Sequence, residues 1–241
     1  MVDVSRETPA APPGARRVFG VEGLVVAERY AGLLATDGVL RGLIGPREAP
    51  RLWDRHLLNS AILGEVVAEG ASVVDVGSGA GLPGLALAIA RPDLSVTLLE
   101  PLLRRTRFLD EVVETLGLSD RVEVLRGRAE ELHGRRTWDV VTARAVAPLE
   151  RLAGWCLPLA SARGELVAMK GASAAEEVER AWPALRALGC ARPVLVELGA
   201  GVLTESTWVV RVARPEDGPV GWRGRPEPGG RRARKQRRTS D

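Results

Sequence analysis

The stretch Val73-Val74-Asp75-Val76-Gly77-Ser78-Gly79-Ala80-Gly81-Leu82-Pro83-Gly84 decides the fold expected of this chain. It opens with an apolar, β-branched run, which is typical of a buried strand in a parallel sheet. Four glycines follow within eight residues, and Leu85-Ala86-Leu87-Ala88-Ile89-Ala90 then indicates a buried helix. In a strand, glycine turn and helix of this kind the backbone approaches a nucleotide-like ligand closely, because glycine has no Cβ and tolerates positive φ. Such a turn can also bind nothing, so the neighbouring elements decide its role.

Downstream of this stretch, strands and helices alternate as in a doubly wound α/β sheet. Strands are expected at Ser72–Val76, Ser95–Glu100, Arg121–Leu125, Asp139–Ala143, Gly164–Met169, Val194–Leu198 and Thr207–Val212. Helices are expected near Gly84–Arg91, Leu103–Leu116, Leu149–Leu159 and Ala174–Leu188, with a helical turn at Ala129–Leu132. No helix of ordinary length fits between the last two strands, so the final strand is expected to enter antiparallel, as a hairpin. The pattern predicts a seven-stranded, mostly parallel sheet.

The two ends of the chain differ from this core in composition. Residues 1–20 are rich in Pro, Ala and Arg, which predicts a disordered extension, and residues 21–70 carry apolar residues at helical spacing, which predicts a helical cap. Residues 71–213 form the predicted core, and residues 214–241 read as a disordered basic tail. From residue 223 onward the chain has eight basic and two acidic residues, so the other residues, 26 basic and 29 acidic, carry a net charge of −3.

Cysteine usage and hydropathy limit the class of protein. Cys156 and Cys190 form no C-x-x-C pair and have no histidine cluster near them, and no secretory signal is recognisable. These features favour a reduced cytoplasmic protein without a metal site. No apolar run approaches the roughly 20 residues of a membrane helix. A monomer is the favoured oligomeric state.

Polar and charged residues gather where a doubly wound sheet places its ligand, at the carboxyl ends of the strands. Asp75 precedes the glycines, and Glu100 ends the second strand, where a carboxylate can accept both hydroxyls of a ribose. The turn at residues 127–130 follows the third strand, where its backbone is expected to meet an adenine edge. Arg144 and Lys170 close the fourth and fifth strands.

Each of these features has a plainer interpretation. Glu100 can be a solvated strand end, and Glu130 an ordinary carboxylate at a helix start. Arg144 can be a structural ion-pair partner, and Lys170 a surface lysine lying along its strand. Their combination in this order favours a ligand site.

Two adenine-containing ligands compete for such a site. A nicotinamide dinucleotide usually accompanies G-x-G-x-x-G, whereas this chain has G-x-G-x-G-x-x-G directly after an acidic residue. The extra glycine and the closing antiparallel strand favour S-adenosylmethionine. Asp75, Gly77, Gly79 and Gly81 are therefore predicted to form its loop, with Glu100 at its ribose. An NAD(P)-dependent oxidoreductase stays as the less favoured alternative, because no Tyr-x-x-x-Lys follows the fourth strand.

Several motifs along the chain together resemble those of one family. They are Arg55-His56-Leu57-Leu58-Asn59-Ser60, the stretch at residues 75–84, Thr97-Leu98-Leu99-Glu100, Arg105, Arg107-Phe108-Leu109, Arg128-Ala129-Glu130-Glu131, Thr142-Ala143-Arg144-Ala145 and Met169-Lys170-Gly171. In this order they resemble the RsmG (GidB) family of bacterial 16S rRNA guanine-N7 methyltransferases. The resemblance implies a Rossmann-like class I S-adenosylmethionine-dependent methyltransferase, acting on guanine 527 of 16S rRNA or the small subunit. Asn59 stands where the family usually has Asp, and no Asn-Leu-Thr element precedes the His-Leu-Leu helix.

The resemblance also implies roles for single residues. Gly77, Leu82, Ala129, Glu130 and Arg144 would contact the cofactor. Because guanine N7 has a free lone pair, methyl transfer needs no general base and no acid–base residue is assigned. Arg144 is expected to hold the cofactor end of the site or to touch only guanine O6, since bidentate reading would cover N7. Lys170 is expected at a phosphate or at O6.

Candidate RNA contacts lie at both ends of the chain. His56 is expected to order the cap or to contact RNA, with plain packing as its alternative. The tail residues would neutralise phosphates, or serve as a solvated extension only; they are Arg231, Arg232, Arg234, Lys235, Arg237 and Arg238. A non-catalytic RNA-binding or ribosome-assembly factor remains the alternative function.

Overall fold

One seven-stranded sheet organises the protein. The structure, a computed structural model, describes residues 10–144, 146–216 and 218. The sheet has the order β3-β2-β1-β4-β5-β7-β6, and its strands are β1 (Ser72–Val76), β2 (Ser95–Glu100), β3 (Val122–Arg126), β4 (Trp138–Arg144), β5 (Ala160–Lys170), β6 (Val194–Leu198) and β7 (Thr207–Ala213). β1 to β5 pair in parallel, while β7 lies antiparallel between β5 and β6. The predicted sheet and closing hairpin are confirmed.

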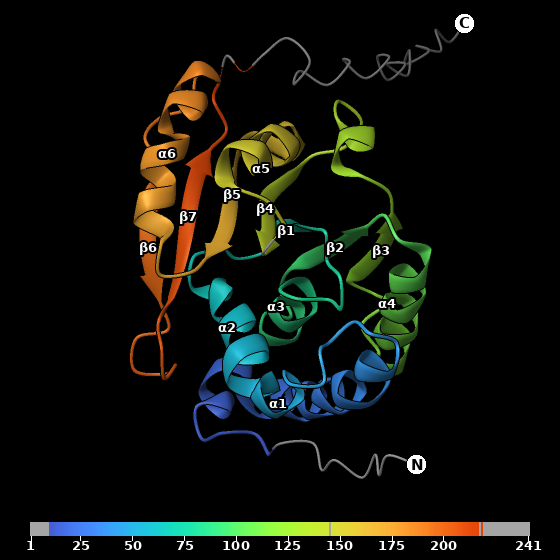
Figure 1. Cartoon of the computed structure of the whole chain (residues 1–241). Helices are drawn as coiled ribbons and strands as arrows, with labels where there is room; N and C mark the ends of the chain where they lie inside the picture. The colour runs from blue at the N-terminus through green and yellow to red at the C-terminus, as the bar shows by residue number, and fades with distance from the viewer. Residues whose placement is uncertain (1–9, 145, 217, 219–241) are drawn as a thin grey trace, which may run out of the picture.

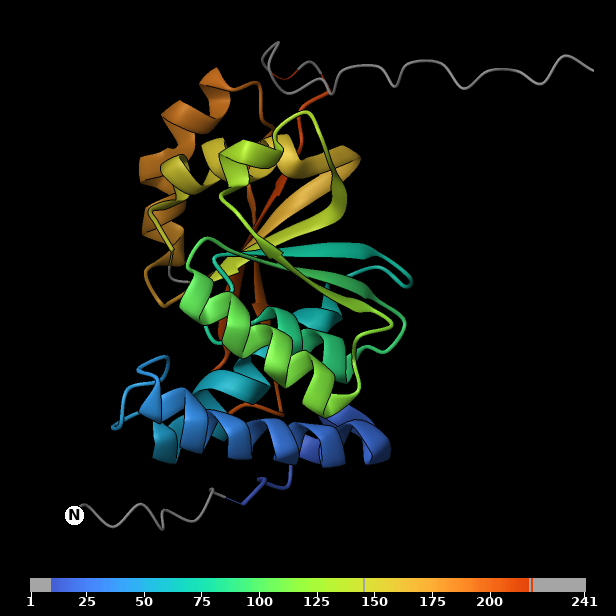
Figure 2. The same cartoon turned by 90° about the vertical axis from the view of Figure 1, so that its right-hand side faces the viewer.

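Helices cover both faces of this sheet. They are α1 (Ala15–Leu33), α2 (Asn59–Ala61), α3 (Gly84–Ala90), α4 (Leu103–Leu116), α5 (Leu149–Cys156) and α6 (Ala174–Ala187). The shorter segments are the π-helical η1 (Leu34–Gly38) and η3 (Leu52–Leu58) and the 3₁₀ turns η2 (Ala49–Arg51), η4 (Ile62–Glu65), η5 (Ala129–Leu132) and η6 (Leu157–Leu159). Figure 1 shows α5 and α6 on one side of the sheet and α1 to α4 on the other. Figure 2 shows α1 lying outside α3 and α4 as an outer layer.

Alternation along β1 explains why valines occupy both faces of this strand, at Val73, Val74 and Val76. Val73 packs into the hydrophobic cluster beneath the cap, whereas Val74 and Val76 pack into the cluster under α5 and α6. Successive side chains of a strand point to opposite faces, so a strand covered on both faces needs apolar residues at nearly every position. Leu98 and Leu99 in β2 divide between the two clusters in the same way.

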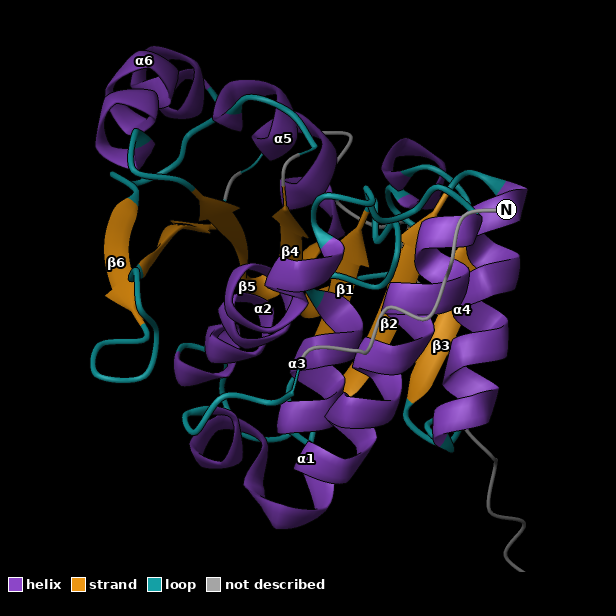
Figure 3. Ribbon diagram, turned by 60° about the horizontal axis from the view of Figure 1, so that its bottom comes forward, coloured by secondary structure: helices purple, strands orange, loops and turns teal. Residues whose placement is uncertain are grey.

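The cap begins earlier than the sequence predicts. α1 starts at Ala15, which is buried, and Phe19 packs edge-to-face against Trp53 with ring centroids 6.2 Å apart. The expected disorder through residue 20 is therefore wrong for residues 15–20. Gly20 interrupts the helical backbone with φ of +69°, and this kink hides the helical periodicity of the segment. Figure 3 shows α1 to α4 gathered on the same side of the sheet.

Parallel pairing brings five chain segments to one edge of the sheet. Val76 pairs with Leu99, Glu100 with Arg126, and Arg144 with Met169. The glycine stretch, Glu100, the turn after β3, Arg144 and Lys170 therefore all lie at the carboxyl edge. The sheet order also reverses between β1 and β4, and open α/β sheets bind ligands at such a switch point.

Candidate functional site

Backbone hydrogen bonds fix the glycine stretch at the carboxyl end of β1. The N–H groups of Gly77 and Ser78 donate to the Leu99 carbonyl at 2.8 and 3.2 Å. Gly81 has φ of +98°, and a Cβ there would lie 2.5 Å from Leu85 Cδ1 and 2.8 Å from the Tyr30 hydroxyl. The loop thus needs glycine for its backbone conformation and for the close approach of α1 and α3.

Asp75 holds the far end of this stretch from inside the protein. Its side chain is fully buried, and its Oδ2 accepts a hydrogen bond from Gly84 N–H at 2.9 Å. Burial raises the pKa of Asp75 to about 6, while the Gly84 hydrogen bond and the charge of Arg144 oppose this shift. In this position Asp75 fixes the start of α3, and it lines neither the pocket nor the groove described below.

Tyr30 joins the cap to the loop. Its hydroxyl donates to the Ala80 carbonyl at 2.7 Å, and the side chain is completely buried. Burial raises the pKa of this phenol, so it remains a hydrogen-bond donor. Sequence reasoning missed Tyr30, because its spacing in α1 is that of any core residue.

A Tyr30→Phe variant is expected to lose about 1–2 kcal/mol of unfolding free energy, because the buried Ala80 carbonyl would lose its donor. Urea unfolding measures this loss. Since the loop would also become less ordered, calorimetry is expected to show weaker S-adenosylmethionine binding. Wild-type values in both measurements would contradict the loop-fixing role of Tyr30.

Glu100 braces the same loop from β2. Its carboxylate is 1% exposed, accepting Gly79 N–H through Oε2 and Leu102 N–H through Oε1, each at 3.0 Å. Arg105 lies 3.5 Å from Oε2. The alternative of a solvated strand end is therefore wrong. A ribose contact stays a prediction, since Oε1 accepts one hydrogen bond among the described contacts and can accept one more.

A small pocket opens beside these groups, with a volume of about 100 Å³. Its walls are mostly apolar, and they are formed by Val76, Gly77, Leu99, Pro101, Gly127, Arg128, Ala129, Glu130, Val146 and Trp155. A Cβ at Gly77 would lie 3.2 Å from Val146 Cγ2, on another wall of the pocket. The slot is narrow and apolar with the exposed Glu130 carboxylate at its rim, and one of its walls is the turn at residues 127–130 that is predicted to meet an adenine edge.

The predicted cofactor residues fall into two groups, those that line the pocket and those that do not. Gly77, Ala129 and Glu130 line it. Asp75, Gly79, Gly81, Leu82, Glu100 and Arg144 do not, and several of them instead hold the backbone that forms its wall. Sequence reasoning missed Val146 and Trp155, because nothing in the spacing of α5 distinguishes Trp155 from a core aromatic residue.

Arg144 lies beyond this pocket, at the end of β4. The guanidinium donates to Ser60 Oγ at 3.3 Å and to His56 Nδ1 at 3.2 Å. Burial lowers the pKa of Arg144, and the charge of Asp75 opposes this shift. Both of these hydrogen-bond partners of Arg144 are neutral groups of the cap. The described contacts therefore do not show the alternative role of Arg144 as a structural ion-pair partner. His56 thus links the cap to the sheet, and its roles in ordering the cap or contacting RNA stay predictions.

A larger groove, of about 560 Å³, adjoins the pocket and shares Val146 with it. Arg144, Asn59 and Lys170 all line this groove. Lys170 Nζ pairs with Glu177 Oε1 at 2.7 Å and donates to the Ala147 carbonyl at 3.2 Å. Its side chain is only 11% exposed, so it is not a freely solvated surface lysine.

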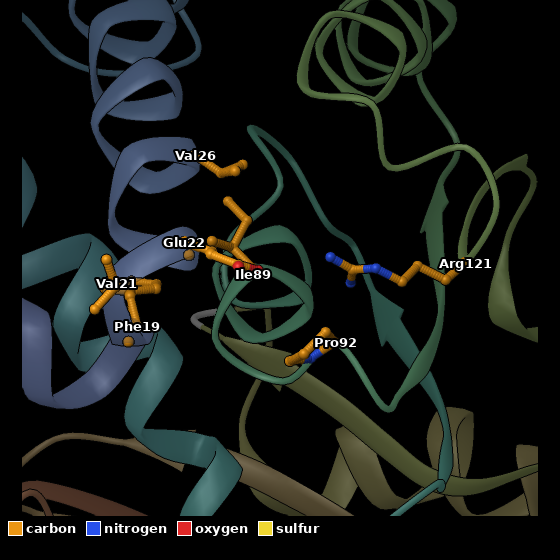
Figure 4. A pocket seen from close by; sticks show the side chains of 9 residues that line it. Phe19, Val21, Glu22, Val26, Ile89, Pro92 and Arg121 are labelled. Atoms are coloured by element: carbon orange, nitrogen blue, oxygen red, sulfur yellow. The ribbon is translucent and has the colours of Figure 1, made fainter.

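Other candidate features lie elsewhere. A cavity of about 500 Å³ lies between α1 and the segments before β2 and β3, with Phe19, Val26, Ile89 and Arg121 among its walls (Figure 4). It is at the opposite edge of the sheet from the glycine stretch.

The tail candidates Arg231, Arg232, Arg234, Lys235, Arg237 and Arg238 lie outside the described residues. Within the described part of the chain, no helix is long and apolar enough to cross a membrane, and no cluster of metal-ligating side chains occurs.

Comparison with solved structures places this arrangement in a known fold. Mitomycin 7-O-methyltransferase is 21% identical with a TM-score of 0.54, covering 77% of this chain and 60% of that one. A SAM-dependent O-methyltransferase from Thermotoga maritima is 15% identical with a TM-score of 0.50, covering 66% and 65%. At these identities the likeness shows the fold alone, which is the Rossmann-like class I methyltransferase fold.

Comparison of sequences is more specific. The GidB family model, described as rRNA small subunit methyltransferase G, matches residues 24–200. A relative from Nocardioides sp. (strain JS614), named ribosomal RNA small subunit methyltransferase G, is 61% identical over 91% of this chain and 88% of its own length. One of the same name from Thermobifida fusca is 54% identical over 93% and 96%. The chain therefore belongs to the GidB family of rRNA small subunit methyltransferases G.

Proposed function

We propose that this protein transfers a methyl group from S-adenosylmethionine to N7 of guanine 527 in the 16S rRNA of the small ribosomal subunit. One observation carries the proposal beyond family membership: an apolar pocket walled by the glycine stretch and a cation-lined groove share Val146 at the carboxyl edge of the sheet. Such an arrangement allows a cofactor and a nucleotide to be held side by side. This substrate implies a cytoplasmic enzyme.

The residues of the pocket would hold the adenosine. Val76, Leu99 and Trp155 provide apolar contact, and Glu130 offers a carboxylate at the rim. When bound, the cofactor supplies an electrophilic methyl group on its sulfonium. The protein then has to keep the cofactor and the guanine in line, which is a positioning task.

The residues of the groove would orient the guanine. Guanine N7 carries no proton, so the protein does not need a base there. The one carboxylate in the groove, Glu177, is occupied by Lys170 Nζ and by Leu149 N–H, each at 2.7 Å. Arg144, Lys170 and Arg180 are thus the donors that the groove offers to guanine O6 or to phosphate oxygens, consistent with a reaction driven by orientation.

Labelled S-adenosylmethionine tests the proposed function. Small subunits that lack the modification are incubated with the protein and the labelled nucleotide is mapped, with naked 16S rRNA as a second substrate. The expected result is label at guanine 527. Binding of RNA without any label would instead support a non-catalytic assembly factor, and label in no RNA would overturn the proposal.

A Lys170→Ala variant tests the phosphate role of this side chain. It is expected to lower kcat/KM for small subunits about 10-fold and to reduce the slope of log affinity against log salt by about 1, because one phosphate contact is lost. Lys170→Arg, which keeps the charge, serves as the matched control. If Lys170→Ala keeps both the wild-type rate and the wild-type slope, the lysine contacts neither phosphate nor O6.

A further inference from the structure

A chain of three side chains runs from the cap to the carboxyl edge of the sheet. Glu48, in the loop before η2, places Oε2 2.8 Å from His56 Nε2. The other ring nitrogen of His56, Nδ1, lies 3.2 Å from a terminal nitrogen of Arg144. Glu48 is about one-third exposed, whereas the His56 side chain is 13% exposed. The chain therefore passes from the surface into the protein and ends at the groove lined by Arg144.

The hydrogen-bond directions in this chain follow from the chemistry of its two ends. Arginine only donates, so His56 Nδ1 must accept and the ring proton must reside on Nε2. Nε2–H then donates to the Glu48 carboxylate, which only accepts when ionised. A doubly protonated ring would place two donors against each other at Arg144. Burial and the charge of Arg144 both lower the pKa of His56, whereas Glu48 opposes this shift.

We propose that Glu48 is a positioning residue for the methyl transfer, because it holds His56 in the tautomer that accepts a hydrogen bond from Arg144. The inference rests on the proposed function. Arg144 lines the groove that adjoins the cofactor pocket, so its orientation decides where its remaining N–H donors point. A carboxylate that fixes the tautomer of a histidine, which in turn orients an acting group, is a recurrent arrangement in enzyme sites.

Loss of Glu48 would remove the contact that fixes the tautomer of the His56 imidazole. Without this acceptor, Nε2 no longer favours the proton, and the Nδ1–H tautomer becomes accessible. A donor would then face the Arg144 guanidinium, which would lose the acceptor that holds one of its nitrogens. Ser60 would remain as the other partner of Arg144, so the side chain would stay in place but with an altered orientation.

Kinetics of two variants measures the effect. Glu48→Ala is expected to lower kcat about 10-fold. This lies at the lower end of the effect of removing a residue that orients a histidine. The effect is small because Glu48 is partly exposed, so water can reach the position that its carboxylate leaves. Glu48→Gln keeps a carbonyl acceptor for Nε2–H and is expected to retain most of the activity. Glu165→Gln is the matched control, because Glu165 pairs with Arg211 between β5 and β7 and takes no part in the chain. Melting temperatures of all three show whether folding is intact.

Nitrogen-15 NMR of the imidazole rings reads the tautomer directly. The protein has two histidines, and His133 Nε2 faces the Trp155 carbonyl at 2.9 Å, so it serves as an internal Nε2–H reference. At pH 8, well above the ordinary His pKa of about 6.5, the wild type is expected to show both rings as Nε2–H. In Glu48→Ala only His56 is expected to shift toward the other tautomer, a change that a purely structural role would not produce.

Two outcomes would overturn the inference. One is a His56 ring that carries its proton on Nδ1 in the wild type, and the other is a Glu48→Ala variant with the wild-type kcat. A wild-type protein that transfers no methyl group would instead refute the proposed function, and the NMR measurement would still decide the tautomer.

Discussion

An Arg144→Ala variant is expected to transfer methyl groups at least about 100-fold more slowly than the wild type. Removing one well-placed donor at a reacting group typically costs 10²–10³ in rate, and Arg144 is a cation that lines the groove adjoining the cofactor pocket. Its loss also leaves His56 Nδ1 and Ser60 Oγ without their donor. Single-turnover methylation of unmodified small subunits measures the rate.

Calorimetry with S-adenosylmethionine then separates the two roles considered for Arg144. Weaker cofactor binding in the variant would assign the guanidinium to the cofactor. Unchanged cofactor affinity would exclude that role and leave guanine O6. Arg211→Ala, which removes an arginine paired with Glu165 away from the site, is the matched control. A wild-type methylation rate in Arg144→Ala would contradict both roles.

A Gly84→Ala variant is expected to lose about 3 kcal/mol of unfolding free energy and most cofactor binding. A Cβ at this position would overlap the Leu98 side chain and lie 2.9 Å from both Asp75 Cβ and Oδ2. Overpacking of a core costs about 1–3 kcal/mol. Moving α3 away would also break the hydrogen bond from Gly84 N–H to the buried Asp75 carboxylate, which adds about 1–3 kcal/mol.

Gly154→Ala is the control for this substitution. Gly154 is exposed within α5, and a Cβ there would meet nothing within 4 Å. Since alanine favours a helix over glycine by roughly 0.5–1 kcal/mol, this variant is expected to be slightly more stable than the wild type. Urea unfolding compares the two variants. Equal stability in both would show that close packing at Gly84 is not what the fold requires.

The strands of the sheet could be predicted from the sequence because the patterns that indicate them are local. The alternation of apolar runs and glycine turns predicts β1, β2 and α4 with the bounds that the structure has, and the short link between the last strands predicts the hairpin. The start of α1 was missed, because Gly20 breaks the periodicity while contacts such as Phe19 with Trp53 stabilise the segment. Those contacts are between residues distant in sequence, and no local pattern reveals them.

The site was predicted by position more reliably than by role. Parallel strands bring their carboxyl ends together, so Asp75, Glu100, Arg144 and Lys170 were correctly placed at one edge. Whether a carboxylate faces a ligand or the backbone depends on burial. Asp75 and Glu100 are buried and accept backbone N–H groups, which spacing alone could not indicate. The pairing of His56 with Arg144, 88 residues later, was equally invisible.

The attachment of the cap has a consequence for how the chain matures during synthesis. The cap is made first, yet Tyr30 finds its acceptor only when Ala80 has been added, and His56 meets Arg144 later still. Its apolar residues also share one hydrophobic cluster with Val209 near the end of the sheet. The residues of the cap therefore cannot complete their docking until most of the sheet has been translated.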